Sequence, residues 1–300
     1  MRPQPFGVVD AHVHFPAWRR RPTPPPAVAA YSRELHRRAR ETWGFPEPEE
    51  EEGASEAELA RRWAQEVERH GLERVLFVTG SSNDNLAAVV RAYPDRFAAL
   101  AYHEPTRPDA RRELAHAVEE LGFHGYKLIA PRLSLPFEDP SLRPLWEYLA
   151  EKRLPLLVHF GILGGGGGLG YHPRMDPRSI HDVARDFPEM PIVVPHFGAG
   201  YWQELLHLGW TCPNVHVDTS GSNDWVRWSA YPLDLESLFR KAYETFGPER
   251  IIFGTDSSWF PRGFSLRYLE DQLRVCRYLR LPEADLALIF GGNARRLYRL

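Results

Sequence analysis

The chain has 300 residues, of which 43% are hydrophobic and 26% charged, and its formal net charge is −3. This length and composition can bury the core of one large domain or two ordinary ones, while the nearly balanced charge gives no basic footprint for nucleic acid. No run approaches the roughly 18 apolar residues of a membrane span, so we expect neither a nucleic acid nor a membrane as partner.

Short apolar runs bounded by turn residues recur along the chain, with helix-like segments between them. Eight runs predict strands, at residues 6–14, 74–80, 97–104, 125–130, 155–161, 191–198, 215–221 and 250–257. The intervening segments predict helices over residues 84–93, 107–121, 140–152, 177–187, 201–209, 234–246 and 264–279. Apolar strands that alternate with helices indicate a buried parallel sheet, and eight such units predict a (β/α)₈ TIM barrel. A doubly wound sheet is the alternative architecture.

Two segments depart from this repeat within the single domain that we expect over residues 1–300. Residues 17–70 are far longer than one connecting helix, and they predict helices near 27–43 and 56–70. An insertion after the first strand would lie over the mouth of the barrel, so we consider a lid or a contact with a second copy of the chain. Residues 282–300 predict one or two extra helices after the last strand.

The first predicted strand ends in VVDAHVHF (8–15), which places His12 and His14 one residue apart. In a β-strand, alternate side chains point to the same face, with Cα atoms about 6.5–7 Å apart. The two imidazoles could therefore share one metal ion. A hydrogen-bonded histidine pair is the simpler interpretation of an isolated H-x-H, so the rest of the chain has to decide between them.

Polar residues gather where the predicted strands end, which is where TIM-barrel active sites lie. These residues are His12, His14, Lys127, His159, His196, Asp218 and Asp256. The pattern places four histidines, a lysine and two aspartates on one rim of the predicted barrel. Chance alone rarely produces such a cluster, so we predict an active site at this rim.

The ordered motifs resemble those of the amidohydrolase superfamily, in particular the group that includes aminocarboxymuconate semialdehyde decarboxylase. The matching pieces are VVDAHVHF (8–15), GYKL (125–128), LLVHFG (156–161), VVPHFGAG (193–200), VHVDTSG (215–221), RIIFGTDSSWF (250–260) and GGNARRLY (291–298). The set covers nearly the whole chain. It is highly specific to the superfamily, less specific to the group, and says little about the substrate.

The resemblance implies a role for each rim residue that matches the family's motifs. His12, His14, His159 and Asp256 would bind one divalent metal ion, zinc in the first place and manganese as the alternative. His196 would be the catalytic acid/base, and Asp256 would also hydrogen-bond a catalytic water. Three imidazoles and a carboxylate suit zinc with one position open for water, and such a metal lowers the pKa of that water to about 7.

Four further residues could contact the substrate. In some superfamily enzymes a lysine on the fourth strand is carboxylated and bridges two metals, but we expect one metal and a Lys127 that faces an anionic group. A lysine that merely snorkels is the alternative. Arg132 and Arg262 follow the fourth and eighth strands and could meet a carboxylate, although surface salt bridges explain them equally well. Trp259 could line the substrate pocket or pack within the protein.

These residues predict a metal-dependent hydrolase in which a metal-activated water splits a C–N or C–O bond of a small, anionic substrate. A non-oxidative decarboxylase or a hydratase acting on a carboxylate-bearing substrate is the alternative. A non-catalytic protein on a decayed barrel is a third hypothesis, and the intact set of ligands argues against it.

The cellular location of the protein is predicted from its N-terminal residues and its cysteines. The N-terminal MRPQPFGVVD lacks the apolar core of a signal peptide, and Cys212 and Cys276 form no C-x-x-C motif. We therefore expect a cytoplasmic, reduced protein. Assembly into a homo-oligomer is left open.

Overall fold

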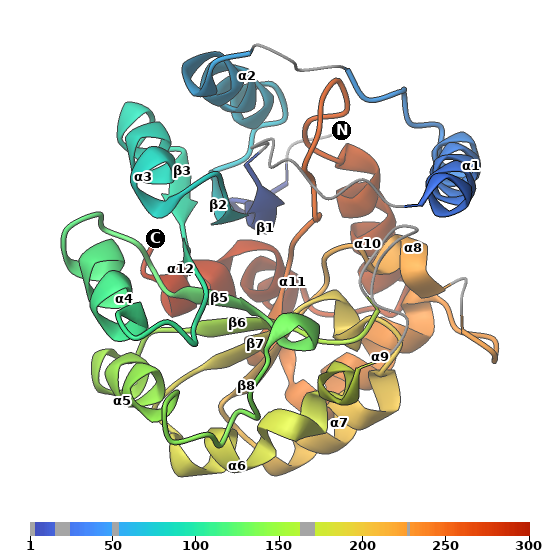
Figure 1. Ribbon diagram of the computed structural model, residues 1–300. Helices are drawn as coiled ribbons and strands as arrows, with labels where there is room; N and C mark the ends of the chain where they lie inside the picture. The colour runs from blue at the N-terminus through green and yellow to red at the C-terminus, as the bar shows by residue number, and fades with distance from the viewer. Residues whose placement is uncertain (1–3, 16–24, 50–53, 163–171, 227–228) are drawn as a thin grey trace.

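The computed structural model describes residues 4–15, 25–49, 54–162, 172–226 and 229–300 (Figure 1). Within these residues the strands are β1 (Val9–His14), β2 (Arg74–Thr79), β3 (Phe97–Ala99), β4 (Ala101–Tyr102), β5 (Tyr126–Ile129), β6 (Leu156–His159), β7 (Ile192–Val194), β8 (Val215–Asp218) and β9 (Ile251–Ile252). They pair in chain order, as β1-β2-β3 and β4 through β9, and every pair is parallel.

The two ends of this strand order lie side by side. Ala11 donates its N–H to the carbonyl of Phe253 at 3.1 Å, and His14 donates to the carbonyl of Ser257 at 2.8 Å. Val13 also forms a parallel bridge with Ser257. The first strand therefore neighbours the segment that directly follows the last strand, β9, and the fold is the TIM barrel that the sequence predicted.

Every predicted strand is shorter in the structure than expected, and three of them differ most. The run 97–104 forms β3 and β4 on either side of Leu100, whose N–H donates to the carbonyl of Phe77 at 2.9 Å. The run 191–198 forms a strand only at β7, because His196 and Phe197 adopt positive φ angles of 60° and 45°. The run 250–257 is a strand only at β9. In the last two runs the backbone leaves the ladder to present polar residues at the barrel mouth.

The helices surround the strands in Figure 1. They are α1 (Pro26–Trp43), α2 (Glu56–Arg69), α3 (Asn83–Ala92), α4 (Ala110–Glu119), α5 (Arg143–Lys152), α6 (His181–Asp186), α7 (Trp202–Thr211), α8 (Ser222–Trp225), α9 (Leu235–Phe246), α10 (Leu266–Tyr278), α11 (Glu283–Ala287) and α12 (Asn293–Tyr298). Oxygen-bearing side chains begin several of them, as at α2, where Ser55 Oγ accepts the N–H of Glu58. In the described part of the chain no helix is long and apolar enough to span a bilayer.

The inserted segment contains α1 and α2, and only α2 is built into the core. Leu59, Trp63 and Val67 lie on one face of α2 and are buried, as the helical period of apolar residues requires. Every α1 residue whose burial is described is exposed or only partly buried. Whether α1 covers the barrel mouth or contacts a second copy therefore stays a prediction.

Apolar side chains inside the barrel form a cluster separate from the one under the helices. Its members are Val9, Ala11, Leu76, Val78, Ala98, Leu100, Leu157, Val193 and Ile252 of the strand region, with Ala294, Leu297 and Tyr298 of α12. Because α12 contacts β1 and β9, it closes the barrel end opposite the polar strand ends. Cys212 and Cys276 are both buried and free.

A bulge in β1 sets the direction of the first polar side chains. Asp10 pairs with Val75 but Val13 pairs with Phe77, so β1 carries one extra residue. Ala11 accordingly belongs to the inner apolar cluster, whereas Val13 packs in the outer one. Such a bulge re-aims side chains, and it leaves His12 and His14 together at the mouth.

Candidate metal centre

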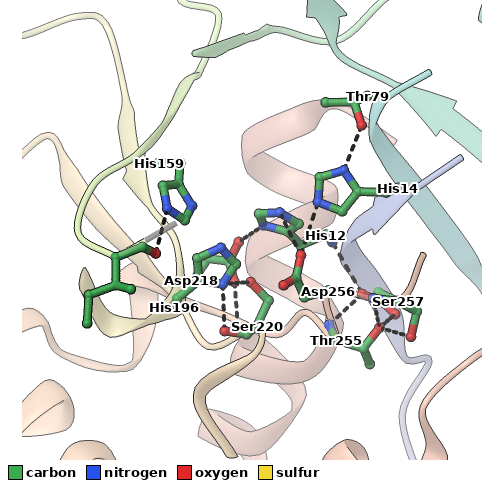
Figure 2. Close-up of polar contacts among 12 residues, drawn as sticks. His12, His14, Thr79, His159, His196, Asp218, Ser220, Thr255, Asp256 and Ser257 are labelled. Atoms are coloured by element: carbon green, nitrogen blue, oxygen red, sulfur yellow. Dashed lines mark hydrogen bonds and ion pairs between the residues drawn. The ribbon is translucent and has the colours of Figure 1, made fainter. Parts of the chain in front are cut away.

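His12, His14 and Asp256 form a compact group at the mouth of the barrel (Figure 2). One ligand atom from each lies within 4.8 Å of the other two. Asp256 Oδ1 is 3.0 Å from His14 Nε2 and 3.6 Å from His12 Nε2. The backbone explains this meeting, because Asp256 donates its N–H to the carbonyl of His12 at 2.9 Å.

Asp256 is held in a backbone conformation that few residues adopt, with φ at 64°. Aspartate tolerates this left-handed region better than most residues, but the conformation is uncommon and often marks a functional site. Burial would raise the pKa of Asp256, but the neighbouring His196, His14 and His12 hold it well below its usual range. The group is therefore an anionic carboxylate at neutral pH.

The other ring nitrogens of the two histidines are already engaged. His12 Nδ1–H donates to Asp218 Oδ2 at 2.6 Å, and His14 Nδ1 hydrogen-bonds Thr79 Oγ1 at 2.6 Å. His12 Nε2 is buried and has no hydrogen-bond partner among the described residues. Burial lowers the pKa of His12, so its Nε2 carries a lone pair. An unpartnered imidazole nitrogen beside a second imidazole and a carboxylate fits a divalent metal ion.

His196 follows β7 and lies against the group. Its ring centroid is 5.0 Å from those of both His12 and His159. Its Nδ1–H donates to the carbonyl of Ser220 at 2.8 Å, with the Ser220 hydroxyl at 2.9 Å. Burial lowers the pKa of His196, so its ring is neutral and Nε2 can accept a proton.

His159, at the end of β6, stands outside the three-residue group. Its Nε2 lies 3.2 Å from the carbonyl oxygen of Ile162, and it does not belong to the group whose ligand atoms lie within 4.8 Å of one another. Burial, His196 and Lys127 lower its pKa well below the usual range. The structure thus brings together three of the four predicted ligands, and a metal-binding role for His159 stays a prediction.

Lys127, on β5, is 2% exposed. Burial lowers its pKa to about 8, against the opposing influence of Asp218 and Asp256. In the described part of the chain its ammonium makes no hydrogen bond or ion pair. Lys127 is therefore a buried, largely charged group, and its substrate-binding role stays a prediction.

The other predicted substrate residues lie elsewhere. Arg132 is exposed in the turn after β5. The Arg262 guanidinium packs over the rings of Phe45 and Trp259, at 4.9 and 5.1 Å from their centroids, and Nη2 donates to Ser257 Oγ at 3.2 Å. Arg262 also lines a cavity of about 300 Å³ between the inserted segment and the loop after β9. Substrate binding by Arg132, Trp259 and Arg262 stays a prediction.

Sequence reasoning assigned no role to the residues that support the histidines. Thr79 ends β2, and Asp218 and Ser220 lie at the end of β8. Asp218 and Ser220 were visible as polar residues at a strand end in VHVDTSG, but nothing in the sequence indicates which histidine each contacts. Thr79 carries no comparable signal, because a single threonine at a strand end is common.

The fold and this site define a TIM-barrel enzyme with a candidate metal centre. A family model of the amidohydrolases matches residues 9–300, and the chain belongs to that family, as the motifs predicted.

Three similar proteins show how far the likeness reaches. The chain is 26% identical over 214 residues to L-fucono-1,5-lactonase of Burkholderia ambifaria, covering 64% of this chain and 67% of that protein. It is 24% identical over 163 residues to protein fluG of Emericella nidulans, covering 51% of this chain but only 18% of that protein. The crystal structure of 5-carboxyvanillate decarboxylase from Sphingomonas paucimobilis is similar at a TM-score of 0.65 and 20% identity, covering 98% and 99% of the two chains. This last likeness concerns the fold alone.

Proposed function

We propose that this protein is a metal-dependent hydrolase that opens an ester, lactone or amide bond in a small substrate bearing a carboxylate. The observation that carries the proposal is the buried His12 Nε2, which has no hydrogen-bond partner among the described residues and lies beside His14 Nε2 and Asp256 Oδ1. The sequence likeness to a lactonase supports it. Zinc is the metal that best suits this donor set.

The residues around the ion would divide the work of hydrolysis. A divalent ion at this site supplies Lewis acidity, which polarises a carbonyl group and lowers the pKa of water. Asp256, anionic at neutral pH, accepts a proton from the attacking water. His196, neutral and held through Nδ1, takes up that proton at Nε2 and delivers it to the leaving oxygen or nitrogen as its bond to the carbonyl carbon breaks.

Lys127 determines the charge of the substrate that fits. A buried cation without a close partner is costly, and a substrate carboxylate placed against it would offset that cost. Its pKa of about 8 leaves most of the ammonium protonated at neutral pH. A carboxylate-bearing substrate therefore suits the cavity better than a neutral one.

Decarboxylation is the second candidate, and the same lysine favours it. Lys127 is buried on β5, which pairs with the β6 strand that ends in His159, so a carboxylate held by Lys127 would lie on the histidine side of the barrel. In this reaction the bond between the carbon and its carboxylate breaks, CO₂ leaves, and the carbon takes up a proton that the neutral Nε2 of His196 first accepts from water. The structural relative from Sphingomonas paucimobilis is such a decarboxylase.

A substrate screen on zinc-loaded protein separates the two reactions. Lactones, esters, amides and hydroxybenzoates, each with and without a carboxylate, are incubated while acid release and CO₂ release are recorded separately. We expect acid release without CO₂ from a carboxylate-bearing lactone, ester or amide. CO₂ release would establish decarboxylation instead. If the protein binds one equivalent of zinc but shows neither reaction, both functions are contradicted.

Lys127→Met tests the assigned substrate charge on the substrate found by the screen. The variant keeps the apolar stem but removes the ammonium. We expect KM to rise about tenfold with kcat little changed, as for an interaction made equally in the ground and transition states. A neutral analogue of the same substrate is the control, and its KM should not change. An equal KM rise for both compounds would contradict the role of charge.

A further inference from the structure

The two carboxylate oxygens of Asp218 connect it to two histidines of the site, to His12 directly and to His196 through Ser220. Its side chain is 1% exposed. Oδ2 accepts Nδ1–H of His12 at 2.6 Å, and Oδ1 accepts the backbone N–H of Ser220 at 2.6 Å. The carboxylate thus has one short hydrogen bond to a candidate metal ligand, His12, and one to the backbone of Ser220, which in turn hydrogen-bonds His196.

The Ser220 peptide continues the connection. Its carbonyl oxygen accepts Nδ1–H of His196 at 2.8 Å, and its hydroxyl lies 2.9 Å from the same nitrogen (Figure 2). A carbonyl oxygen can only accept a hydrogen bond, so Nδ1 of His196 must carry the proton. The two imidazoles, 5.0 Å apart between centroids, are therefore oriented by one continuous set of bonds that centres on Asp218.

The surrounding backbone is shaped to allow these contacts. A Cβ on Gly254 would lie 2.7 Å from His12 Cβ and 3.2 Å from Asp218 Oδ1, so only glycine admits this approach. On the other side, Thr219 donates its hydroxyl to Gln272 Oε1 at 2.7 Å, and Gln272 Nε2 donates to the carbonyl of Thr219 at 3.1 Å. The segment after β8 is anchored from both directions, which leaves Asp218 little freedom.

The second histidine of the group is supported differently. His14 Nδ1 meets the Thr79 hydroxyl, which can donate or accept, whereas a carboxylate can only accept. In this structure His14 Nε2–H donates to Asp256 Oδ1 at 3.0 Å, and the Thr79 hydroxyl also accommodates the Nδ1–H tautomer that a metal ion would require, while Asp218 permits only the Nδ1–H tautomer of His12. The tautomer of His12 is thus fixed in advance, and that of His14 can adjust.

We propose that Asp218 is a positioning residue that couples the two functions of the site: it fixes His12 with Nε2 toward the metal ion and, through the Ser220 peptide, fixes His196 with Nε2 toward the substrate. The inference deepens the proposed function and rests on it. Asp218 itself contacts neither the ion nor the substrate; it acts through the histidines.

Asp218→Asn is the decisive change, for a reason of hydrogen-bond valence. Asp218 accepts from two donors, His12 Nδ1–H and the Ser220 N–H. An asparagine in its place has one accepting oxygen and one NH₂ group, so it cannot serve both. Because the backbone N–H of Ser220 cannot change, the NH₂ group faces His12, and the proton of His12 moves to Nε2. The nitrogen that should bind the metal is then blocked.

The first measurement needs no substrate. The dissociation constant for Zn²⁺ is determined by competition with a chelator for wild type, Asp218→Asn and Ser220→Ala. We expect Asp218→Asn to weaken zinc binding by about 10–100-fold, the usual effect of losing a carboxylate behind a ligating histidine. Ser220→Ala is the matched control, because it removes a buried hydroxyl next to His196 but keeps both bonds of Asp218. Its zinc affinity should stay within about threefold of wild type.

The second measurement separates positioning from a mere loss of negative charge. ¹⁵N spectra of histidine-labelled, metal-free protein report which ring nitrogen carries the proton, with His12→Gln and His196→Gln used for assignment. Wild-type His12 and His196 should both be Nδ1–H, and His12 in Asp218→Asn should be Nε2–H. A weaker zinc affinity with His12 still Nδ1–H would mean that Asp218 contributes charge only, and would overturn the proposal.

The wild-type spectrum protects the test against a variant that fails to fold. If His12 or His196 is Nε2–H in the wild type, the proposal is wrong without any variant. Wild-type zinc affinity in a folded Asp218→Asn would also overturn it, as would an equal loss in Ser220→Ala. Failure of the wild type to bind zinc at all would instead contradict the proposed function, so the two failures are distinguishable.

Discussion

The two ends of the barrel are built for different purposes. At the closed end, α12 packs Leu297 and Tyr298 against an apolar layer that includes Val9 and Ile252. At the mouth, His12, Lys127 and Asp218 are buried polar groups, and His196, Phe197 and Asp256 have positive φ angles. One end gains stability from apolar burial, whereas the other holds desolvated charge and strained backbone.

The mouth carries features that cost stability and would serve the proposed function, whereas the closed end does not. Buried charge and left-handed backbone at non-glycine residues each cost stability unless something offsets them. Within the described residues the mouth lacks a close partner for the ammonium of Lys127 and for His12 Nε2. A metal ion would be the partner of His12 Nε2, and an anionic substrate would be the partner of the Lys127 ammonium. Changes at the mouth should therefore affect activity, and changes at the closed end should affect stability.

The largest effect is expected from His14→Ala. The His14 side chain is 30% exposed, so its loss should change the free energy of unfolding by less than about 1 kcal/mol in the presence of a chelator. It should nevertheless abolish metal binding, because the group keeps only His12 and Asp256. Elemental analysis and assays on one preparation check this, and we expect activity at background. A variant that retains a full equivalent of metal would remove His14 from the metal centre.

A smaller loss of activity is expected from His196→Asn, without loss of metal. His196 is buried among the catalytic groups but belongs outside the three-residue group. Removing a positioned acid/base should lower kcat/KM by roughly 10²–10⁴-fold. His181→Asn, at a partly exposed histidine of α6, is the control and should behave as wild type. Loss of metal in His196→Asn would make His196 a ligand, and unchanged kcat/KM would exclude it from catalysis.

The sequence predicted the barrel and most of its mouth because local patterns carry that information. Alternating apolar runs and helices specify the repeat, and H-x-H at a strand end places His12 and His14 on one face. Contacts between distant residues leave no such pattern. The Asp218–His12 bond spans 206 positions, and Arg262 stacks on Phe45 from the inserted segment. The direction of His159 likewise depends on the backbone that follows it, which the strand pattern does not determine.

At the closed end, Leu297→Ala should lower stability and leave activity intact. Leu297 is 7% exposed and packs in the inner apolar cluster, so its truncation should lower the free energy of unfolding by about 2–3 kcal/mol. Denaturant melts measure this, with Val28→Ala on α1, which is 37% exposed, as the control within about 0.5 kcal/mol. Zinc affinity and kcat/KM at 25 °C should match wild type. A large fall in kcat/KM of the folded variant would break the division between the two ends.

The smallest effect concerns pH and a histidine away from the mouth. His216, on β8, donates Nδ1–H to the carbonyl of Asn214 at 3.1 Å. Burial lowers its pKa from 6.5 to about 4, against that hydrogen bond and with Arg296 and Arg250 adding to the shift. Because the folded state resists protonation and the unfolded state does not, the stability from neutral His216 is complete above pH 6.5. It falls as the pH drops toward 4.

His216→Gln isolates this contribution. The amide can still donate to Asn214 but cannot take up a proton, so its stability should depend less on pH. From a shift of this size we expect wild type to lose about 2 kcal/mol more than His216→Gln between pH 7 and pH 5. Denaturant melts at the two pH values measure it, and other titrating groups cancel in the difference. Parallel pH dependences would mean that His216 is as readily protonated in the folded protein as in the unfolded chain. In that case a charged His216 would be tolerated away from the mouth. The two ends of the barrel would then differ in where their residues lie, and not in how strongly they disfavour a buried charge.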